Sequence, residues 1–210
     1  MKTLPTIGGI AALGHTAVLM VGMVLSFTVM LPLLEATPDQ ALTFLVTHPI
    51  LANLWMWGVD GGTAITLMIL VWVLYERMKT GEPMLALMAT AFGWLWAGLI
   101  VANSDLTLHN FGVVPNLIRS GPAQVAAWTA LARSQWVLLL SLAAVRTGGL
   151  TRASSTLGMC LGLVGILTTV PAITEIMFMI FGPGMMVWSA WVGITLLRRN
   201  AGVTPQPVEP

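Results

Sequence analysis

The stretch ILANLWMWGVDGGTAITLMILVWVLY, residues 50–75, decides the fold class. It is apolar along nearly its whole length, and about 20 apolar residues cross a bilayer as a helix. It also carries one acid, Asp60, and a carboxylate inside hydrocarbon is costly unless it is paired, protonated or in contact with water. We therefore expect a transmembrane helix whose acid must be accommodated by the rest of the chain.

Composition extends this conclusion to the whole chain. Of its 210 residues, 57% are hydrophobic and 8% are charged, whereas a soluble domain carries about 25% charged residues. Because so few charges cannot cover a surface in water, the lipid bilayer is the expected partner. The net charge of +1 gives no indication of nucleic-acid binding. The single cysteine, Cys160, excludes an intramolecular disulfide, and we expect it to be buried in an apolar core.

Hydropathy predicts an all-α, polytopic membrane protein, a bundle of six transmembrane helices in one domain over residues 1–199. The predicted spans are residues 8–34, 50–75, 84–103, 123–145, 156–170 and 176–197. The proline-rich residues 200–210 are expected to form a disordered tail. Gly182-Pro183-Gly184 lies inside the last span and should bend or locally unwind it.

A short interfacial helix is predicted over residues 38–47, between the first two spans. Thr37 can cap its first turn, Pro38 suits the first helical position, and Gln40 can complete a capping box. Apolar residues on one side of this segment would rest on the membrane surface.

The basic residues indicate an orientation. Of nine in the chain, only Arg119 and Arg133 fall on the outer side of this arrangement or inside a span. The others share one side: Lys2, Arg77, Lys79, Arg146, Arg152, Arg198 and Arg199. The positive-inside rule places that side, and with it both termini, in the cytoplasm.

Asp60 and Arg133 each lie about ten residues from the outer end of their predicted spans, or about 15 Å deep. Two opposite charges at one depth predict an ion pair near the membrane midplane. Asn53 and Trp57 precede Asp60 at helical spacing and are expected to face inward with it. The pair is interpreted either as a ligand-binding site or as a purely structural element.

Several tryptophans fall near the centres of their spans, where interfacial belts do not explain them. These are Trp94, Trp96, Trp136 and Trp188. They are expected either to line a pocket for an apolar ligand or to pack against small residues such as Gly93. Trp136 is included in the predicted ligand site.

A second group of polar residues gathers at the outer side of the predicted bundle. The weak candidates for metal ligands are His48, His109, Asp105 and Glu175, with Glu35 and Asn103 in the same region. They come from four separate segments of the chain, so we predict no metal site. His15 stands alone near the other side, which disfavours a haem held by two histidines. Retinal would need a lysine inside a span, and none is present, so no cofactor is expected.

No catalytic motif of the GxSxG, HExxH, P-loop or strand-linked GxGxxG type occurs, which disfavours an enzyme. Three hypotheses remain. The first is a protein that binds or moves a small solute, a proton or an apolar molecule through a polar site in the outer half of the bundle. The second is an accessory subunit of a larger membrane complex, or a homo-oligomer. The third is a membrane-embedded enzyme that uses the outer histidines and acids.

Three features carry a resemblance to a known group of proteins. They are the layout of the first two spans with an amphipathic outer segment, the start of the fifth span at Gly149-Leu150-Thr151-Arg152, and the closing WVGITLLRR of residues 191–199. In these features the chain resembles a bacterial family of six-span integral membrane proteins of unknown function. The resemblance implies a location in the bacterial cytoplasmic (inner) membrane and transfers no functional residue.

Overall fold

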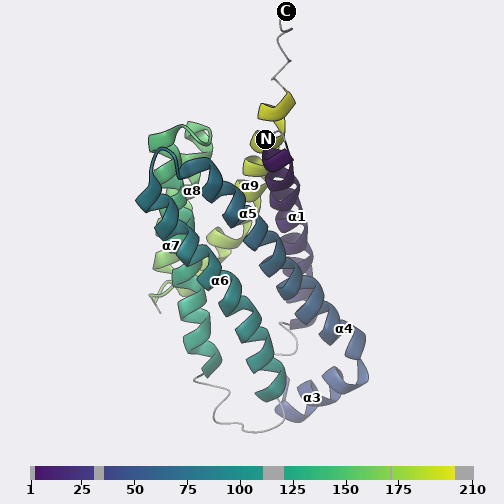
Figure 1. The fold of residues 1–210 in the computed structure, drawn as a ribbon. Helices are drawn as coiled ribbons and strands as arrows, with labels where there is room; N and C mark the ends of the chain where they lie inside the picture. The colour runs from purple at the N-terminus through teal and green to yellow at the C-terminus, as the bar shows by residue number, and fades with distance from the viewer. Residues whose placement is uncertain (1–2, 31–35, 111–120, 171, 202–210) are drawn as a thin grey trace, which may run out of the picture.

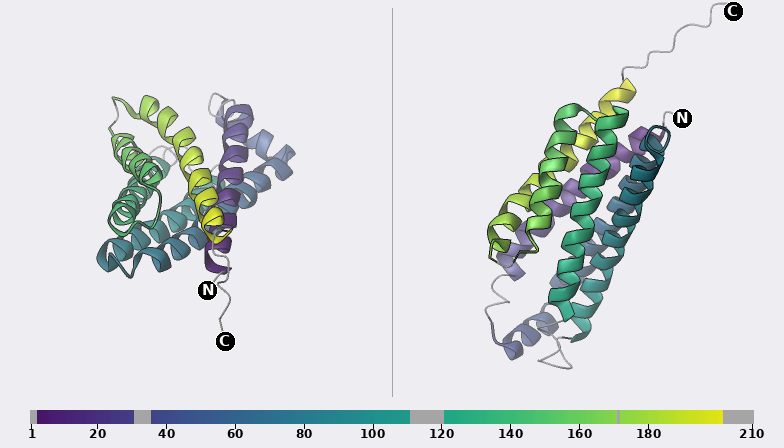
Figure 2. Two further views of the ribbon diagram at one scale, coloured as in Figure 1. Left: turned by 90° about the horizontal axis from the view of Figure 1, so that it is seen from above. Right: turned by 90° about the vertical axis from the view of Figure 1, so that its left-hand side faces the viewer.

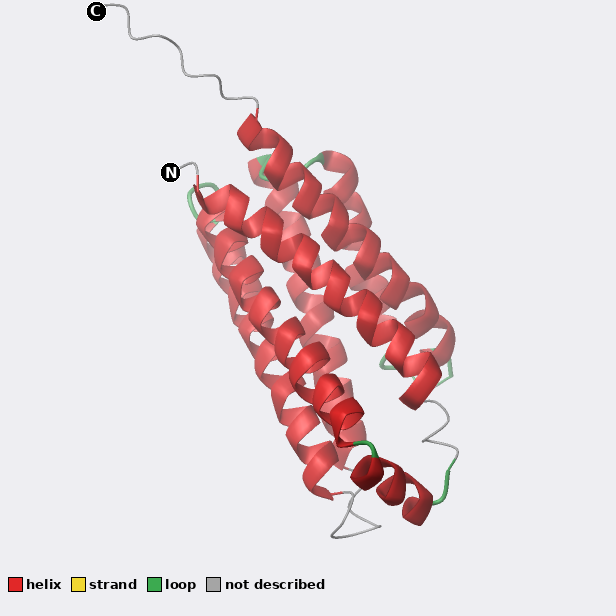
Figure 3. Ribbon diagram, turned by 90° about the vertical axis from the view of Figure 1, so that its right-hand side faces the viewer, coloured by secondary structure: helices red, strands yellow, loops and turns green. Residues whose placement is uncertain are grey.

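The computed structural model describes residues 3–30, 36–110, 121–170 and 172–201, and every regular element in these ranges is a helix (Figure 3). The α-helices, and two π-helices labelled η, follow in the order α1 (Thr3–Leu25), η1 (Ser26–Met30), α3 (Pro38–Thr47), α4 (Pro49–Asn53), η2 (Leu54–Gly61), α5 (Gly62–Met78), α6 (Pro83–Asn110), α7 (Gly121–Thr147), α8 (Arg152–Leu167) and α9 (Thr174–Ala201). The predicted all-α class is confirmed.

Five of these segments are long and apolar enough to cross a membrane. They are Thr3–Val29, Trp57–Met78, Pro83–Ala102, Ala127–Thr147 and Thr174–Arg198, and they make this a membrane protein. The remaining apolar helix, α8, has 16 residues, or about 24 Å at 1.5 Å per residue. It is shorter than the hydrocarbon core of roughly 30 Å. The six predicted spans therefore correspond to five long helices and one short helix.

The six large helices form a closed ring in chain order. Each of α1, α5, α6, α7, α8 and α9 packs against the next, and α9 returns to α1. Helices α7 and α8 stand on one side of the bundle and α1 on the opposite side (Figures 1 and 2). Among these six helices, only α5 and α7 bring their backbones close together across the ring in the described part of the chain. Side chains must therefore fill its interior.

One end of the ring carries most of the charge. Helix α1 begins and α9 ends there (Figure 1), and the α5–α6 and α7–α8 loops lie at the same end. The basic residues gathered at this end are Arg77, Lys79, Arg146, Arg152 and Arg198. We call it the basic end. These residues share one side of the molecule, as the sequence predicts.

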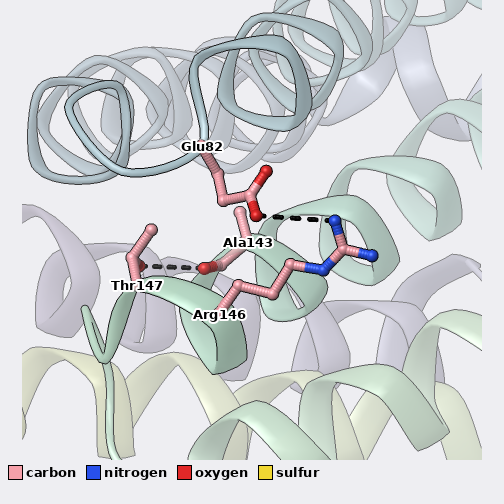
Figure 4. A network of polar contacts seen from close by, with 4 residues as sticks. All are labelled: Glu82, Ala143, Arg146 and Thr147. Carbon is pink, nitrogen blue, oxygen red and sulfur yellow. Dashed lines mark hydrogen bonds and ion pairs between the residues drawn. The ribbon is translucent and has the colours of Figure 1, made fainter.

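Polar contacts fasten the two loops of the basic end to each other. The Nε of Arg77 donates to a carbonyl of the α7–α8 loop at 2.6 Å, and Arg146 forms an ion pair with Glu82 at 3.4 Å (Figure 4). Lys79 pairs with Glu76 at 2.8 Å, and the hydrogen bond to that carboxylate raises the pKa of Lys79. Solvent screens exposed pairs of this kind, so they order the loops rather than hold the helices together.

The predicted start of the short helix between the first two spans is confirmed. Helix α3 begins at Pro38, and the side chain of Thr37 accepts from the backbone N–H of Gln40 at 3.4 Å. The Gln40 side chain in turn accepts from the Thr37 N–H at 3.0 Å. This reciprocal box satisfies two backbone donors that a helix start leaves free. The helix ends at Thr47, just before His48-Pro49, because a proline disfavours the helical conformation of the preceding residue.

Helix α9 continues through Pro183, so local unwinding, one of the two alternatives for this segment, is not found; transmembrane helices tolerate an internal proline because neighbouring groups satisfy the freed carbonyl. One local expectation is corrected. Cys160 is exposed on α8 rather than buried, because glycines occupy the inward positions of that helix. The first residues of the expected tail belong to α9, and residues 202–210 lie outside the described residues.

These glycines bring α8 close to α7. Gly158, Gly162 and Gly165 recur at helical spacing, and all three are buried. A Cβ on Gly162 would lie 2.6 Å from the Cβ of Leu138 and 2.9 Å from its Cα. Small residues at this spacing let membrane helices approach until their backbones nearly touch.

We predict that Gly162→Ala destabilises the bundle by about 1–3 kcal/mol, because the added methyl group overpacks the α7 backbone. The matched control is Gly98→Ala on α6, where an added Cβ would meet nothing within 4 Å. The control should be neutral or slightly stabilising, since alanine is the better helix former. Thermal unfolding in detergent, followed by circular dichroism, measures both. Equal unfolding temperatures for the two variants would contradict the close packing of α7 and α8.

Candidate functional site

Aromatic side chains fill the interior of the ring. Trp96 of α6, Trp136 of α7 and Trp188 of α9 are 5%, 1% and 0% exposed. Their ring centroids lie 5.5 Å apart from Trp96 to Trp136 and 5.7 Å apart from Trp136 to Trp188. The imidazole of His15 on α1 meets Trp96 edge-on at 5.9 Å. We call these four residues the aromatic layer, which joins α1 to α6 and α7 to α9 across the ring.

The layer crosses the bundle at mid-depth. Each of its residues lies about 12 residues, or about 18 Å, from the basic end of its helix. The hydrocarbon core of a bilayer is roughly 30 Å thick, so this distance reaches its middle region. The indole N–H of Trp188 donates to the Ser154 carbonyl at 3.0 Å. Gly93 makes room for Trp136, because a Cβ there would lie 2.8 Å from the indole Cδ1. Packing against small residues, one of the two expectations for these tryptophans, is thus found for Trp136.

His15 lies fully buried beside hydroxyl groups. Its Nδ1 is 3.1 Å from the Thr66 Oγ1, and the Thr66 hydroxyl donates to the Gly62 carbonyl at 2.7 Å. A hydroxyl has one proton to give, so Nδ1–H is the donor to Thr66. No described residue hydrogen-bonds the Nε2 of His15. Thr16 follows His15 on α1, and Ser189 follows Trp188 on α9. Their hydroxyls are 2.8 Å apart and join the two helices.

Arg133 lies outside the aromatic layer, with its guanidinium directed at two aromatic side chains of α9. Its guanidinium carbon is 4.2 Å from the ring centroid of Phe181 and 5.5 Å from that of Phe178. Phe181 is buried and Phe178 is exposed. Gly165 of α8 leaves the space for Phe181, because a Cβ there would come within 2.6 Å of the phenylalanine ring.

The guanidinium has stacking partners but lacks acceptors. The Nε of Arg133 is buried without a hydrogen-bond partner, and the ion pairs between described residues do not include this arginine. Cations over aromatic faces gain about 0.5–2 kcal/mol, but the N–H donors in the guanidinium plane still require oxygen acceptors. The site is a planar cation with unmet hydrogen-bonding capacity.

Asp60 lies elsewhere. It is half-buried on η2, which packs against α1, α5 and α6, whereas Arg133 faces α9. The predicted Asp60–Arg133 ion pair is not found among the described residues. Asp60 itself belongs to this π-helix, which follows α4 directly and continues into α5. Ligand binding by Asp60 stays a prediction.

The inward stripe predicted beside Asp60 is broken. Trp57 is 69% exposed, and the exposed Asn53 donates to the Pro49 carbonyl of its own helix, whereas Thr63 and Ala64 further along are buried. In a π-helix each N–H bonds five residues back, so successive side chains turn through a smaller angle than in an α-helix. The expectation that Asn53 and Trp57 face inward is wrong for this reason.

The outer polar residues do not assemble into a metal centre in the described part of the chain, which holds no group of three or more His, Cys, Asp or Glu side chains suited to a metal ion. His48 is exposed and stacks on Phe44 at 4.4 Å, and Glu175 is exposed in the first turn of α9. The side chains of Asp105 and His109 lie outside the described residues.

The best-formed hollows of the described surface lie away from both charges. One of about 410 Å³ is lined by Gln40, Thr43, Phe44 and Thr47 of α3. The other, of about 190 Å³, is apolar and lies between α1 and the α4–η2 segment, lined by Ala17, Val18, Val21, Leu54, Gly58 and Val59. Neither is lined by Asp60 or Arg133.

No family model, curated protein or solved structure matches this chain. The resemblance to the bacterial six-span family stays a prediction, and the site has to be interpreted from its own geometry.

Sequence reasoning missed the polar centre at His15 and the two phenylalanines beside Arg133. Counting residues from the basic end places His15 at the depth of the three buried tryptophans, and this signal was present in the sequence. The pairing of Arg133 with α9 had no such signal, because it depends on how α7 and α9 are rotated about their axes.

We predict that Trp188→Phe lowers the stability of the bundle by about 1–3 kcal/mol, since it removes a buried hydrogen bond and part of a ring contact. Trp94→Phe is the matched control. Trp94 is 45% exposed, so this substitution should lower the stability little. Unfolding temperatures of the purified variants, compared in one detergent, check this. A loss for Trp94→Phe as large as that for Trp188→Phe would contradict the role of the aromatic layer.

Proposed function

We propose that this protein is a six-span protein of the bacterial inner membrane that binds a small ligand at Arg133, in the half of the bundle away from the basic end. The observation that carries the proposal is a cation inside a candidate span with buried Nε and no acceptor among the described residues. An arginine inside a span is costly, and at the centre of a helix the cost is about 2.5–3.5 kcal/mol on insertion scales. Such residues mark ligand, ion or partner sites, because a bound group can supply the acceptors that offset this cost.

The proposed six spans include α8. Helix α7 ends at the basic end, and α9 also ends there, so α8 must lead from the basic end to the opposite one. Its packing supports this direction: an added Cβ on Gly158 would meet Ser141, and one on Gly165, two turns later, would meet Ser134. A span of about 24 Å is accommodated by tilt or local thinning of the bilayer. The basic end then faces the cytoplasm.

Binding from the side, rather than conduction along the axis, fits the packing best. The aromatic layer fills the ring at mid-depth, and the best-formed hollows are not lined by either charge. Arg133, in contrast, contacts Phe178 of α9, which is 56% exposed. A molecule dissolved in the membrane would approach the guanidinium past this side chain.

The same arginine supports an accessory subunit as the second candidate. A carboxylate on a helix of another chain would supply the acceptors that Arg133 lacks, and desolvated ion pairs of this type fix the register between chains. Homo-oligomers belong to this candidate if a second copy provides the acid. An enzyme has no comparable support, because no described contact brings the outer histidines and acids together.

We predict that Ala172→Cys, between α8 and α9, reacts with a membrane-impermeant maleimide in intact cells, since six spans place this connection outside. Thr80→Cys, in the loop between α5 and α6 at the basic end, should react only after the membrane is opened. Both residues are exposed, and both variants are made in a Cys160→Ser background. Labelling of Thr80→Cys but not Ala172→Cys in intact cells would reverse the orientation, and protection of both would leave α8 outside the membrane core.

We predict that the native protein, purified in a mild non-ionic detergent, retains a stoichiometric non-protein mass by native mass spectrometry. Arg133→Gln should lose it, because the amide lacks the charge and the donor fork. Arg146→Gln is the matched control on the same helix, since Arg146 is exposed and ion-paired at the basic end. A protein partner lost in Arg133→Gln would favour the subunit instead. Identical spectra for wild type and Arg133→Gln would overturn both.

A further inference from the structure

We infer that the ligand of Arg133 is an amphiphile with an oxyanion headgroup, a carboxylate or phosphate carried on an apolar chain. The inference rests on the proposed function and names the chemical class of its ligand. Three independent features of the site carry it: the donor set, the depth and the apolar surroundings.

The donor set selects an oxyanion. A guanidinium presents N–H groups in a planar fork that matches the two oxygens of a carboxylate or phosphate. The guanidinium carbon of Arg133 lies over the Phe181 ring, 4.2 Å from its centroid, and this ring supplies no oxygen acceptor. Nε is buried and has no acceptor among the described residues. The acid on α9, Glu175, is exposed and forms no ion pair with Arg133 in the described part of the chain.

The depth selects a molecule that lies in the membrane. Arg133 is fourteen residues from the end of α7 at the basic end, about 21 Å at 1.5 Å per residue, which leaves about 9 Å of a hydrocarbon core of roughly 30 Å on the outer side. Side chains on a helix lean towards its N-terminus, and the N-terminus of α7 is at the outer end. The long arginine arm therefore raises the guanidinium towards the level where lipid headgroups meet hydrocarbon.

The surroundings select an apolar chain behind the headgroup. The exposed residues of α9 near the site are Ile176, Phe178, Met179 and Ile180. Trp128, one to two turns before Arg133 on α7, is 60% exposed and suits the interface. A free phosphate ion would leave these surfaces uncovered, whereas an acyl chain would lie along them with its headgroup on the arginine.

The test is a native mass spectrometry titration of the full-length protein in non-ionic detergent with oleate, methyl oleate and monododecyl phosphate. Oleate and dodecyl phosphate should bind at least about tenfold more tightly than methyl oleate, which has a similar chain without a charge. Arg133→Gln should remove this difference, Arg133→Lys should keep part of it, and Arg146→Gln should keep all of it. Circular dichroism of each variant confirms that it is folded.

Two competitors identify the source of the headgroup. If the ligand is a single-chain amphiphile, excess inorganic phosphate and phosphatidylglycerol should both leave oleate bound. Displacement by phosphatidylglycerol would assign the site to a bilayer lipid, which keeps the inferred chemistry. Displacement by inorganic phosphate alone would overturn the requirement for an apolar chain.

The failure of the inference differs from the failure of the proposed function. Equal binding of oleate and methyl oleate, weakened together in Arg133→Gln, would overturn the oxyanion headgroup and leave a neutral ligand at the same site. Equal affinity of wild type and Arg133→Gln for all three probes overturns the inference. The proposed function is then decided separately, by whether a non-protein mass co-purifies with the wild type from native membranes and is lost in Arg133→Gln.

Discussion

Contact between aromatic rings across the axis is the constraint on which the rest of the bundle depends. Helices that touch only their neighbours in a ring leave a central space, and no hydrophobic effect closes it in lipid, because lipid tails are as apolar as the side chains. Van der Waals contact must hold opposite walls together. Trp96, Trp136 and Trp188 supply it with the largest side chain available, and each buried aromatic contributes roughly 150–250 Å². Small residues in the walls, such as Gly93 and Gly158, are the complement of these large rings.

The large rings at the axis and the small residues in the walls also determine where polar side chains can lie. A filled axis offers no continuous polar path, so a charged group has to lie in a wall or at a seam between helices. Arg133 does so in the wall formed by α7, where Phe181 of α9 packs against its guanidinium. His15 is the exception, because it lies in the layer itself, where its Nδ1 is hydrogen-bonded to the Thr66 hydroxyl. The molecule therefore combines a rigid centre with one polar site that faces its surroundings.

The sequence predicted features that are local or depend on depth along a helix. The capping box of Thr37 and Gln40 is formed, because it involves only neighbours in the chain. The basic end is formed as well, because it follows from the number and direction of the helices. Depth alone did not pair Asp60 with Arg133, because two residues at one level can face different walls. The π-helical turns before Asp60 also have no recognisable sequence pattern, and they rotate Trp57 outward.

The closure of the ring by its first and last helices has a consequence for biogenesis. Helix α1 is synthesised before its partner α9, and the two meet at Gly9 and Gly193 with almost no space between their backbones. Until α9 is made, the hydroxyl of Thr16 lacks Ser189. Closure of the ring therefore waits for the synthesis of α9. A product truncated before α9 would expose the face of α1 that carries Thr16, which gives membrane quality control a surface by which to recognise an unfinished protein.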